Sequence, residues 1–235
     1  MLKTEIEVCI EDPDTAELAA QYGANRVELC SALDLGGLTP SAGLIEACVA
    51  VQGPEVFAMI RPRGGDFTYS SREVDSMARD IEAAQKAGAG GVVFGCLHDD
   101  HRLDMKTNKH LIDIAHSMNM GTTFHRAFDF TPDPESTLEK LIELGFDRLL
   151  TSGTRKTAIE GIETIRKLVK IANGRIDIMA GSGVNDRNAA ELLTTGIQAI
   201  HFTARTALTT KDPLDMGIRY VPDPEKIKKI IHAIA

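Results

Sequence analysis

Short apolar runs alternate with longer amphipathic segments along the chain. Runs rich in apolar and β-branched residues are typical of buried strands. They lie at residues 5–10, 26–30, 55–60, 91–95, 121–125, 147–151, 176–180 and 199–202. Segments with helical periodicity follow them at residues 15–22, 42 to about 51, 72–87, 104–118, 134–144, 158–171, 187–194 and 223–234. The pattern therefore predicts a chain built from strand-then-helix units.

This alternation predicts parallel strands joined by right-handed crossovers. Eight runs of each kind favour a closed (β/α)8 TIM barrel, an α/β fold that forms a single domain over residues 1–235. A doubly wound open sheet is the alternative. It would ordinarily carry a glycine-rich fingerprint after the first strand, and the Cys-Ile-Glu-Asp-Pro sequence at residues 9–13 does not resemble one.

The composition fits one sizeable domain. The chain has 235 residues, of which 43% are hydrophobic, enough for one core and few for two ordinary domains. Its net charge of −8 argues against nucleic acid as a partner. No secretory apolar region begins the chain, and no apolar run reaches the roughly 20 residues that span a bilayer. These features predict a cytoplasmic protein without a membrane partner and leave a homodimer open.

An unusual stretch follows the predicted strand at 55–60. Two arginines, Arg61 and Arg63, stand beside Pro62, a Gly64-Gly65 pair and Asp66. Pro and Gly-Gly end the strand and let the backbone turn. Arginine keeps its charge and offers a planar fork of donors that suits a carboxylate or phosphate. We therefore expect Arg61, Arg63 and Asp66 to bind an anionic substrate. The alternative is a structural arginine pair that holds the loop through salt bridges.

The first two predicted strands both end in Glu-x-Cys, at Glu7 and Cys9 and at Glu28 and Cys30. Side chains alternate along a strand, so within each strand the Glu and the Cys point the same way. Carboxylates that faced the apolar helix layer would cost several kcal/mol each unless paired. We therefore expect Glu7 and Glu28 to face the barrel interior. The chain has no Cys-x-x-Cys spacing, so its thiols are expected to be reduced.

Two histidines stand at other strand ends. His125 ends the fifth predicted strand, with Arg126 and Asp129 in the loop beyond it, and His201 lies in the eighth. The carboxyl ends of the strands form the functional face of a TIM barrel, so these side chains should meet the two glutamates there. Such a group is typical of a site. The alternative is a polar ion-pair plug that only fills the barrel.

Small residues follow two of the later strands. Ser152 and Gly153 come after the sixth strand, and Gly181, Ser182 and Gly183 come after the seventh. Small side chains let backbone N–H groups approach an anion, and TIM barrels often bind phosphate at these loops. We expect these residues, with Arg126 and Asp129, to contribute to substrate binding. A tight turn without a ligand is the alternative.

Several of these stretches together resemble the CutC copper homeostasis family. They are residues 28–30, 36–41, 60–67, 123–129, 150–153 and 179–184, and the resemblance extends over nearly the whole chain. The resemblance implies a cytoplasmic TIM barrel that is associated with copper homeostasis and binds Cu(I). It places the copper role on Cys9 and Cys30, because thiolates suit this soft ion. The loops at 99–102 and 201–204 depart from the family pattern.

Two functions from different classes follow. The first is a copper-handling protein that binds Cu(I) through Cys9 and Cys30. The second is an enzyme that acts on a small phosphorylated or carboxylated metabolite at the barrel mouth. In the second, Glu7 or Glu28 would be the general base and His125 or His201 the general acid, with the arginines holding the anion. A ligand-binding barrel without chemistry is a third option.

Overall fold

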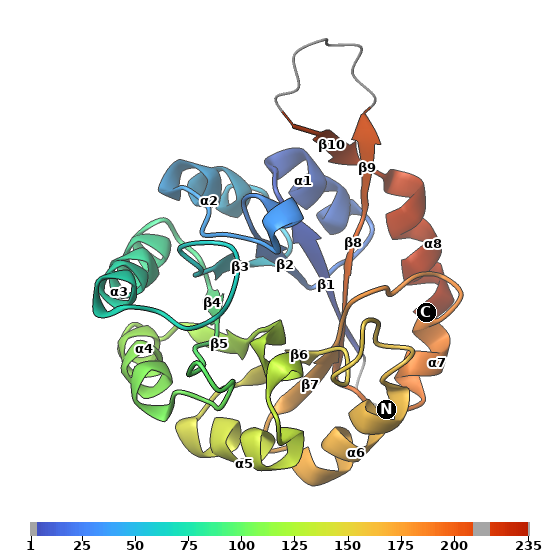
Figure 1. The fold of residues 1–235 in the computed structure, drawn as a ribbon. Coiled ribbons are helices and arrows are strands. Elements are labelled where there is room, and N and C mark those ends of the chain that lie inside the picture. The colour runs from blue at the N-terminus through green and yellow to red at the C-terminus, as the bar shows by residue number, and fades with distance from the viewer. Residues whose placement is uncertain (1–3, 209–216, 235) are drawn as a thin grey trace.

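The computed structural model describes residues 4–208 and 217–234. In it, a closed barrel of parallel strands forms the centre of the molecule (Figure 1). The strands are β1 (Glu5–Ile10), β2 (Arg26–Leu29), β3 (Glu55–Met59), β4 (Gly91–Phe94), β5 (Gly121–Phe124), β6 (Arg148–Thr151), β7 (Asp177–Ala180) and β8 (Ala199–Thr203). Each pairs with its neighbour in sequence, and β8 closes the barrel against β1. The predicted (β/α)8 TIM barrel is confirmed. The ends of the predicted domain, residues 1–3 and 235, lie outside the described residues.

Helices surround the barrel as an outer ring (Figure 1). They are α1 (Pro13–Gln21), α2 (Ala42–Val49), α3 (Ser71–Lys86), α4 (Met105–Ser117), α5 (Pro134–Leu144), α6 (Ile162–Ala172), α7 (Ala189–Leu193) and α8 (Pro224–Ile234). Two short 3-10 helices, η1 (Leu33–Leu35) and η2 (Arg126–Phe130), follow β2 and β5. None of the described helices is long and apolar enough to cross a membrane.

Two parts of the predicted pattern differ from the structure. Helix α6 begins at Ile162, later than predicted, because the backbone N–H of Ala158 bonds to the Ser182 carbonyl in the next loop instead of starting a helix. The sequence also gave no sign of an antiparallel hairpin between β8 and α8. Its strands, β9 (Arg205–Leu208) and β10 (Arg219–Pro222), form a separate two-stranded sheet that projects from the barrel (Figure 1).

Alternation along the strands separates the large outer apolar core from two smaller apolar clusters, of which one contains Leu150, Met179 and Ala199. Val8 and Val27 point outward and join the large core between strands and helices. Phe57, Met59 and Val93 point inward and pack inside the barrel with the two cysteines of β1 and the β2 end. This division matches the expected strand phase. Buried polar residues, among them Glu7 and Glu28, take other inward positions.

Candidate functional site

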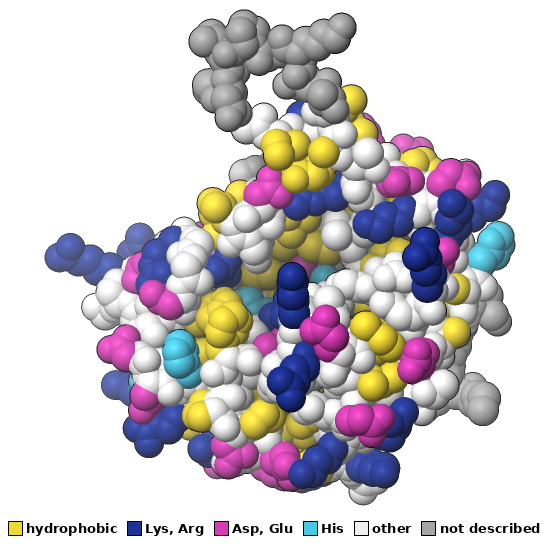
Figure 2. All heavy atoms as spheres, turned by 45° about the vertical axis from the view of Figure 1, so that its right-hand side comes forward, with side chains coloured by type: hydrophobic (Ala, Val, Ile, Leu, Met, Phe, Trp, Pro, Cys, Tyr) yellow, Lys and Arg dark blue, Asp and Glu magenta, His cyan; other side chains and the backbone are white. Residues whose placement is uncertain are grey.

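A cavity of about 700 Å³ opens at the carboxyl ends of the barrel strands. Figure 2 shows it as a hollow beneath the β9–β10 hairpin, with apolar side chains in its wall and arginine or lysine side chains beside it. Of the predicted site residues, nine line this cavity: Cys9, Glu28, Arg61, Asp66, His125, Arg126, Ser182, Gly183 and His201. Its apolar lining includes Met59, Phe67, Leu97, Phe130, Leu150 and Phe202. The cavity has the size and mixed lining of a small-molecule site.

A buried group of charges lies beside this cavity. Glu7 is fully buried, and its Oε2 accepts a hydrogen bond of 2.6 Å from Arg26 Nε. Its Oε1 lies 2.7 Å from His201 Nδ1. The other ring nitrogen of His201, Nε2, lies 3.8 Å from Glu28 Oε2. Three neighbouring strands, β8, β1 and β2, thus place two carboxylates and two basic groups in one chain of contacts.

The electrostatics of this group favour a charged His201. Burial alone would lower its pKa, but Glu28, Cys9 and Glu7 together raise the pKa of His201 well above its ordinary value. The pKa of Glu28 is raised, mainly by burial and further by Glu7, while His201 opposes the rise. Glu28 Oε1 is buried without a hydrogen-bond partner among the described residues. Glu28 lines the cavity, and one oxygen of its carboxyl group is therefore an unused hydrogen-bond acceptor.

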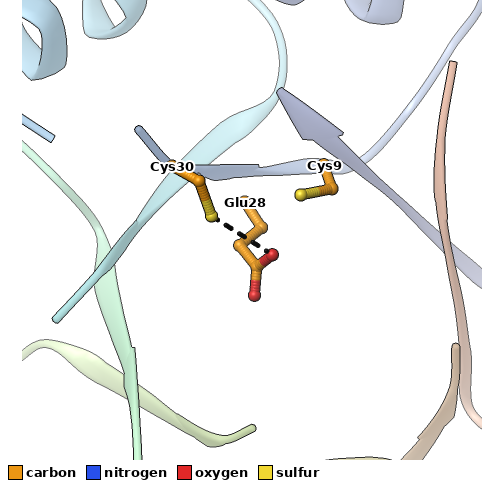
Figure 3. A group of neighbouring side chains, drawn as sticks. All are labelled: Cys9, Glu28 and Cys30. Atoms are coloured by element: carbon orange, nitrogen blue, oxygen red, sulfur yellow. Dashed lines mark hydrogen bonds between the residues drawn. The ribbon is translucent and has the colours of Figure 1, made fainter. Parts of the chain in front are cut away.

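Two thiols lie next to Glu28 (Figure 3). In the parallel register Cys9 stands opposite Glu28, and Cys30 lies two residues further along the β2 end. The Cys30 thiol donates a hydrogen bond of 3.6 Å to Glu28 Oε2. The two sulfurs and a Glu28 oxygen all lie within 4.8 Å of one another. These donors fit a soft metal ion such as Cu(I), because sulfur is the ligand that it prefers.

Both thiols are protonated near neutral pH. A hydrogen bond with Cys30 and burial raise the pKa of Cys9 well above its ordinary value. For Cys30 the hydrogen bond with Cys9 lowers the pKa, but burial and the Glu28 carboxylate outweigh it and raise the pKa to about 11. Binding of a metal ion as a bis-thiolate would therefore release protons. A second set of possible ligands, Glu7, Glu28 and His201, shares Glu28 with the first.

Arg61 reaches the cavity wall from the β3 end and is only 4% exposed. Its Nη1 donates to the carbonyls of Leu35 and Gly37, at 2.8 and 3.1 Å, and its Nη2 donates to Gly65 at 2.9 Å. These bonds tie η1 and the loop after β3 to the barrel. Arg61 Nε is buried without a partner in the described structure.

Arg63, the second predicted arginine, does not line the cavity. Its Nε bonds to Glu73 of α3 at 2.6 Å, and its Nη2 bonds to Asp66 at 2.9 Å. Strand β3 ends at Met59, so the regular alternation of side chains does not extend to Arg61 and Arg63, and the two side chains point to different partners. Arg63 thereby fastens the loop to α3, while Asp66 touches the cavity from the same loop.

Asp129 organises the loop after β6 without lining the cavity. Its carboxylate accepts hydrogen bonds from Arg126, Thr151, Ser152 and the Thr154 N–H, at 2.5 to 3.1 Å. Ser152 is fully buried; its backbone N–H donates to Asp129, and its hydroxyl donates to the Arg155 carbonyl. These contacts occupy the polar groups of Asp129. They position Arg126 at the cavity.

The glycines of the predicted anion loops serve close packing. Gly153 has a φ of +68°, and a Cβ there would lie 2.3 Å from the Gly161 carbonyl oxygen. A Cβ on Gly181 would lie 2.6 Å from a Leu150 methyl group and 3.2 Å from His201. Neither glycine lines the cavity, whereas Ser182 and Gly183 do. The roles of these residues in ligand binding stay predictions.

Arg26 belongs to the buried charge group, but it was missed in the sequence. It lies two residues before Glu28 on the same strand, so the phase argument applied to Glu28 could have found it. Its guanidinium also stacks over the Phe57 ring, 4.2 Å from the centroid. The partner that balances Glu7 is therefore a strand arginine at the base of the site.

The fold and this site together define a TIM-barrel protein with a polar cavity at the carboxyl ends of its strands. A sequence model of the CutC family matches residues 4–206. A CutC family protein of Vibrio cholerae is 49% identical over an alignment of 247 positions, which covers 100% of this chain and 97% of that protein. One from Sinorhizobium medicae is 49% identical over 88% of this chain and 84% of that protein. The chain belongs to the CutC family, as its motifs predicted.

Two solved structures with similar folds were also found, one from the CutC family and one from outside it. The CutC protein of Streptococcus agalactiae, which is named for copper homeostasis, has 34% identity and a TM-score of 0.79, covering 84% of this chain and 97% of that one. A thiamine phosphate pyrophosphorylase from Pyrococcus furiosus has 14% identity and a TM-score of 0.62, covering 99% of this chain and 96% of that one. The second likeness concerns the barrel fold alone.

Proposed function

We propose that this protein acts in copper homeostasis and binds one Cu(I) ion through the thiolates of Cys9 and Cys30. The observation that carries the proposal is the placement of both sulfurs and a Glu28 oxygen within 4.8 Å of one another. Cu(I) accepts two thiolates readily, and a bis-thiolate needs no further ligand. The copper homeostasis name of the Streptococcus agalactiae relative agrees with this role.

The placement of the pair also supports selectivity. Both thiols lie inside the barrel, and Cys9 lines the cavity whereas Cys30 is fully buried. Hard, strongly hydrated ions gain little from sulfur ligands, so a site of this composition favours a soft ion. Glu28 accepts a hydrogen bond from Cys30, which holds that thiol in place.

An anaerobic titration of Cu(I) against a competing chelator tests the proposal. The parent should bind about one ion per chain, and Cys9→Ser and Cys30→Ser should each weaken binding more than roughly a hundredfold, beyond the usual effect of losing an outer-shell partner. Cys48→Ser and Cys96→Ser are matched controls, because both thiols are buried in the outer core, away from the cavity. Unchanged affinity in the double Cys9 and Cys30 variant would refute the proposal.

A second candidate function is supported by the cavity itself. Copper binding needs neither a cavity of about 700 Å³ nor the chain of contacts that joins Glu7, His201 and Glu28. Those features suit an enzyme that moves a proton on a small anionic metabolite, with Glu28 as general base and His201 as general acid. Exchange of carbon-bound protons of small keto and hydroxy acids into D2O, followed by NMR, tests this role. Glu28→Gln should abolish any exchange, and the absence of exchange with the parent would contradict it.

A further inference from the structure

Arg61 carries a charge in the cavity wall that no carboxylate balances. Three arginines line the cavity, and two of them have acidic partners: Arg126 bonds to Asp129, and Arg205 bonds to Glu11 and Asp34. Arg61 has no acidic group within 4.0 Å among the described residues; its three hydrogen bonds go to backbone carbonyls. A buried guanidinium without a counter-ion is costly, and carbonyl dipoles offset only part of that cost.

The polar neighbours of Arg61 are neutral. Burial and the positive charge of Arg61 lower the pKa of His125 to about 3. Burial raises the pKa of Tyr69 to about 12, although Arg61 opposes the rise. Neither side chain adds a charge at neutral pH, so this part of the wall carries the single positive charge of Arg61. The side chain that would neutralise it is not supplied by the described part of the chain.

The tautomer of His125 adds a hydrogen-bond donor. Its Nδ1 accepts a hydrogen bond of 3.3 Å from the Ala127 backbone N–H. A neutral imidazole that accepts at Nδ1 carries its proton at Nε2. This Nε2–H is buried and has no partner among the described residues. Arg61 Nε and His125 Nε2 are therefore two unpartnered donors in residues that line one cavity.

We infer that the barrel mouth binds the carboxylate group of a small organic molecule through Arg61 and His125. The charge of a carboxylate matches the single charge of Arg61, whereas a phosphate dianion would bring a second negative charge towards Glu28 and Asp66, which line the same cavity. The apolar wall, which includes Met59, suits an organic body and not a bare inorganic ion.

The rest of the cavity narrows the ligand class further. Glu28 Oε1 and Thr203 Oγ1 are buried and have no hydrogen-bond partner within residues 4–208 and 217–234, and both residues line the cavity. A carboxyl oxygen accepts hydrogen bonds, so the unpartnered Glu28 oxygen suits a hydroxyl or amino donor on the ligand. The site therefore fits a carboxylic acid with an apolar body and one such donor. This inference names a ligand class for the second candidate function, and the biological role of the ligand rests on that function. The binding itself can be tested without any catalytic turnover.

Ligand-detected NMR on the full chain tests this binding with benzoate, phenylpropanoate and phenyllactate, each beside its primary amide. The amides keep the shape but lose the charge. Each acid should bind, and its amide should bind at least about tenfold more weakly, since a charge-assisted pair exceeds a neutral one by about that factor. Phenyllactate should bind more tightly than phenylpropanoate, because it adds a hydroxyl donor for Glu28. Equal binding of acids and amides, or no binding of any acid at millimolar concentration, would overturn the inference.

Variants locate the carboxylate. Arg61→Met should weaken the acids to the level of the amides, whereas Arg102→Met should not change binding. Arg102 is a matched control, because it is exposed on the loop after β4 and pairs with Asp100 outside the cavity. If the acids still bind to Arg61→Met as they bind to the parent, Arg61 does not bind the ligand carboxylate and the inference is refuted. This holds even if Glu28→Gln loses the D2O exchange. Binding without exchange would instead contradict only the enzymatic role.

Arg61 also holds three loop carbonyls, so Arg61→Met can fail to fold. In that case a parent crystal soaked with bromobenzoate gives the answer through the anomalous signal of bromine. A molecule in the cavity with its carboxylate on Arg61 or His125 supports the inference. A molecule bound elsewhere, or none in the cavity, overturns it.

Discussion

The neutral, buried His125 should make the protein lose stability as the pH falls from 7 to 5. His125 is 5% exposed, and its folded-state pKa is about 3, against an ordinary value of 6.5. Between these values the unfolded chain binds a proton at this residue and the folded chain does not. Stability from this group is complete above pH 6.5 and is lost progressively below it.

The magnitude follows from the shift. One pKa unit corresponds to about 1.4 kcal/mol, and pH 5 lies about 1.5 units below the ordinary histidine value. At pH 5 the protonated unfolded state should thus gain roughly 2 kcal/mol over the folded state from His125 alone. His125→Asn removes the titration, while its side-chain oxygen can still accept from the Ala127 N–H.

Urea unfolding of the parent and of His125→Asn, each at pH 7 and pH 5, measures this effect. The other titrating groups contribute to both proteins, so the difference between the two pH-dependent losses isolates His125. The parent should lose roughly 2 kcal/mol more than the variant. Equal losses would show that His125 is charged or solvated in the folded state. An NMR titration in which its ring protons shift between pH 6 and 7 would refute the reasoning directly.

The remaining predictions concern glycines. Gly91→Ala should destabilise the protein by about 3 kcal/mol in urea unfolding, because the new Cβ would lie 2.2 Å from the Phe57 ring inside the barrel. A stability equal to the parent's would show that the ring can move away. Gly43→Ala lies in α2 with no atom within 4 Å of the added Cβ, so the same substitution should stabilise by up to about 1 kcal/mol. A loss of stability there would mean that α2 is held by something other than its helix propensity.

The barrel could be predicted because the same strand-then-helix pattern recurs along the whole sequence. Each strand is a short run buried on both faces, and each is followed by an amphipathic helix, so errors at one boundary do not change the topology. The predicted strand ends extend at most a residue or two beyond the observed ones, as at Ile60, where the backbone N–H still bonds to Val93. Closure of β8 on β1 depends on all units together, and the count of eight was enough to predict it.

The inward placement of Glu7 and Glu28 followed from strand phase and from the cost of turning a carboxylate into an apolar layer. Both residues are indeed buried inside the barrel. The same reasoning does not reach Arg63, because phase has no meaning beyond the end of β3. Its partner Glu73 lies on α3, and only the folded loop brings the two together. Which side chains meet beyond a strand end depends on loop conformation, which local sequence does not determine.

The β9–β10 hairpin shows a different limit. None of its strand residues is buried, so the strands lack the alternation of buried and polar positions that predicts a strand. The contacts that hold it are long-range. Arg205 bonds to Glu11 and Asp34, and it stacks over Tyr220 at 3.8 Å from the ring centroid. Partners so distant in sequence leave no local pattern to read.

The floor of the barrel decides how a ligand reaches the site. A Cβ on Gly91 or Gly121 would lie 2.2 or 2.8 Å from Phe57, so this ring fills the interior above the two glycines. Arg26 covers the ring and pairs with Glu7, which places a buried ion pair between the floor and the thiols. A route from below would have to break that pair, at a cost of about 3 to 5 kcal/mol. Cu(I) and an organic carboxylate would therefore both enter through the mouth, and the ion would meet Cys9 first, because Cys9 lines the cavity and Cys30 does not.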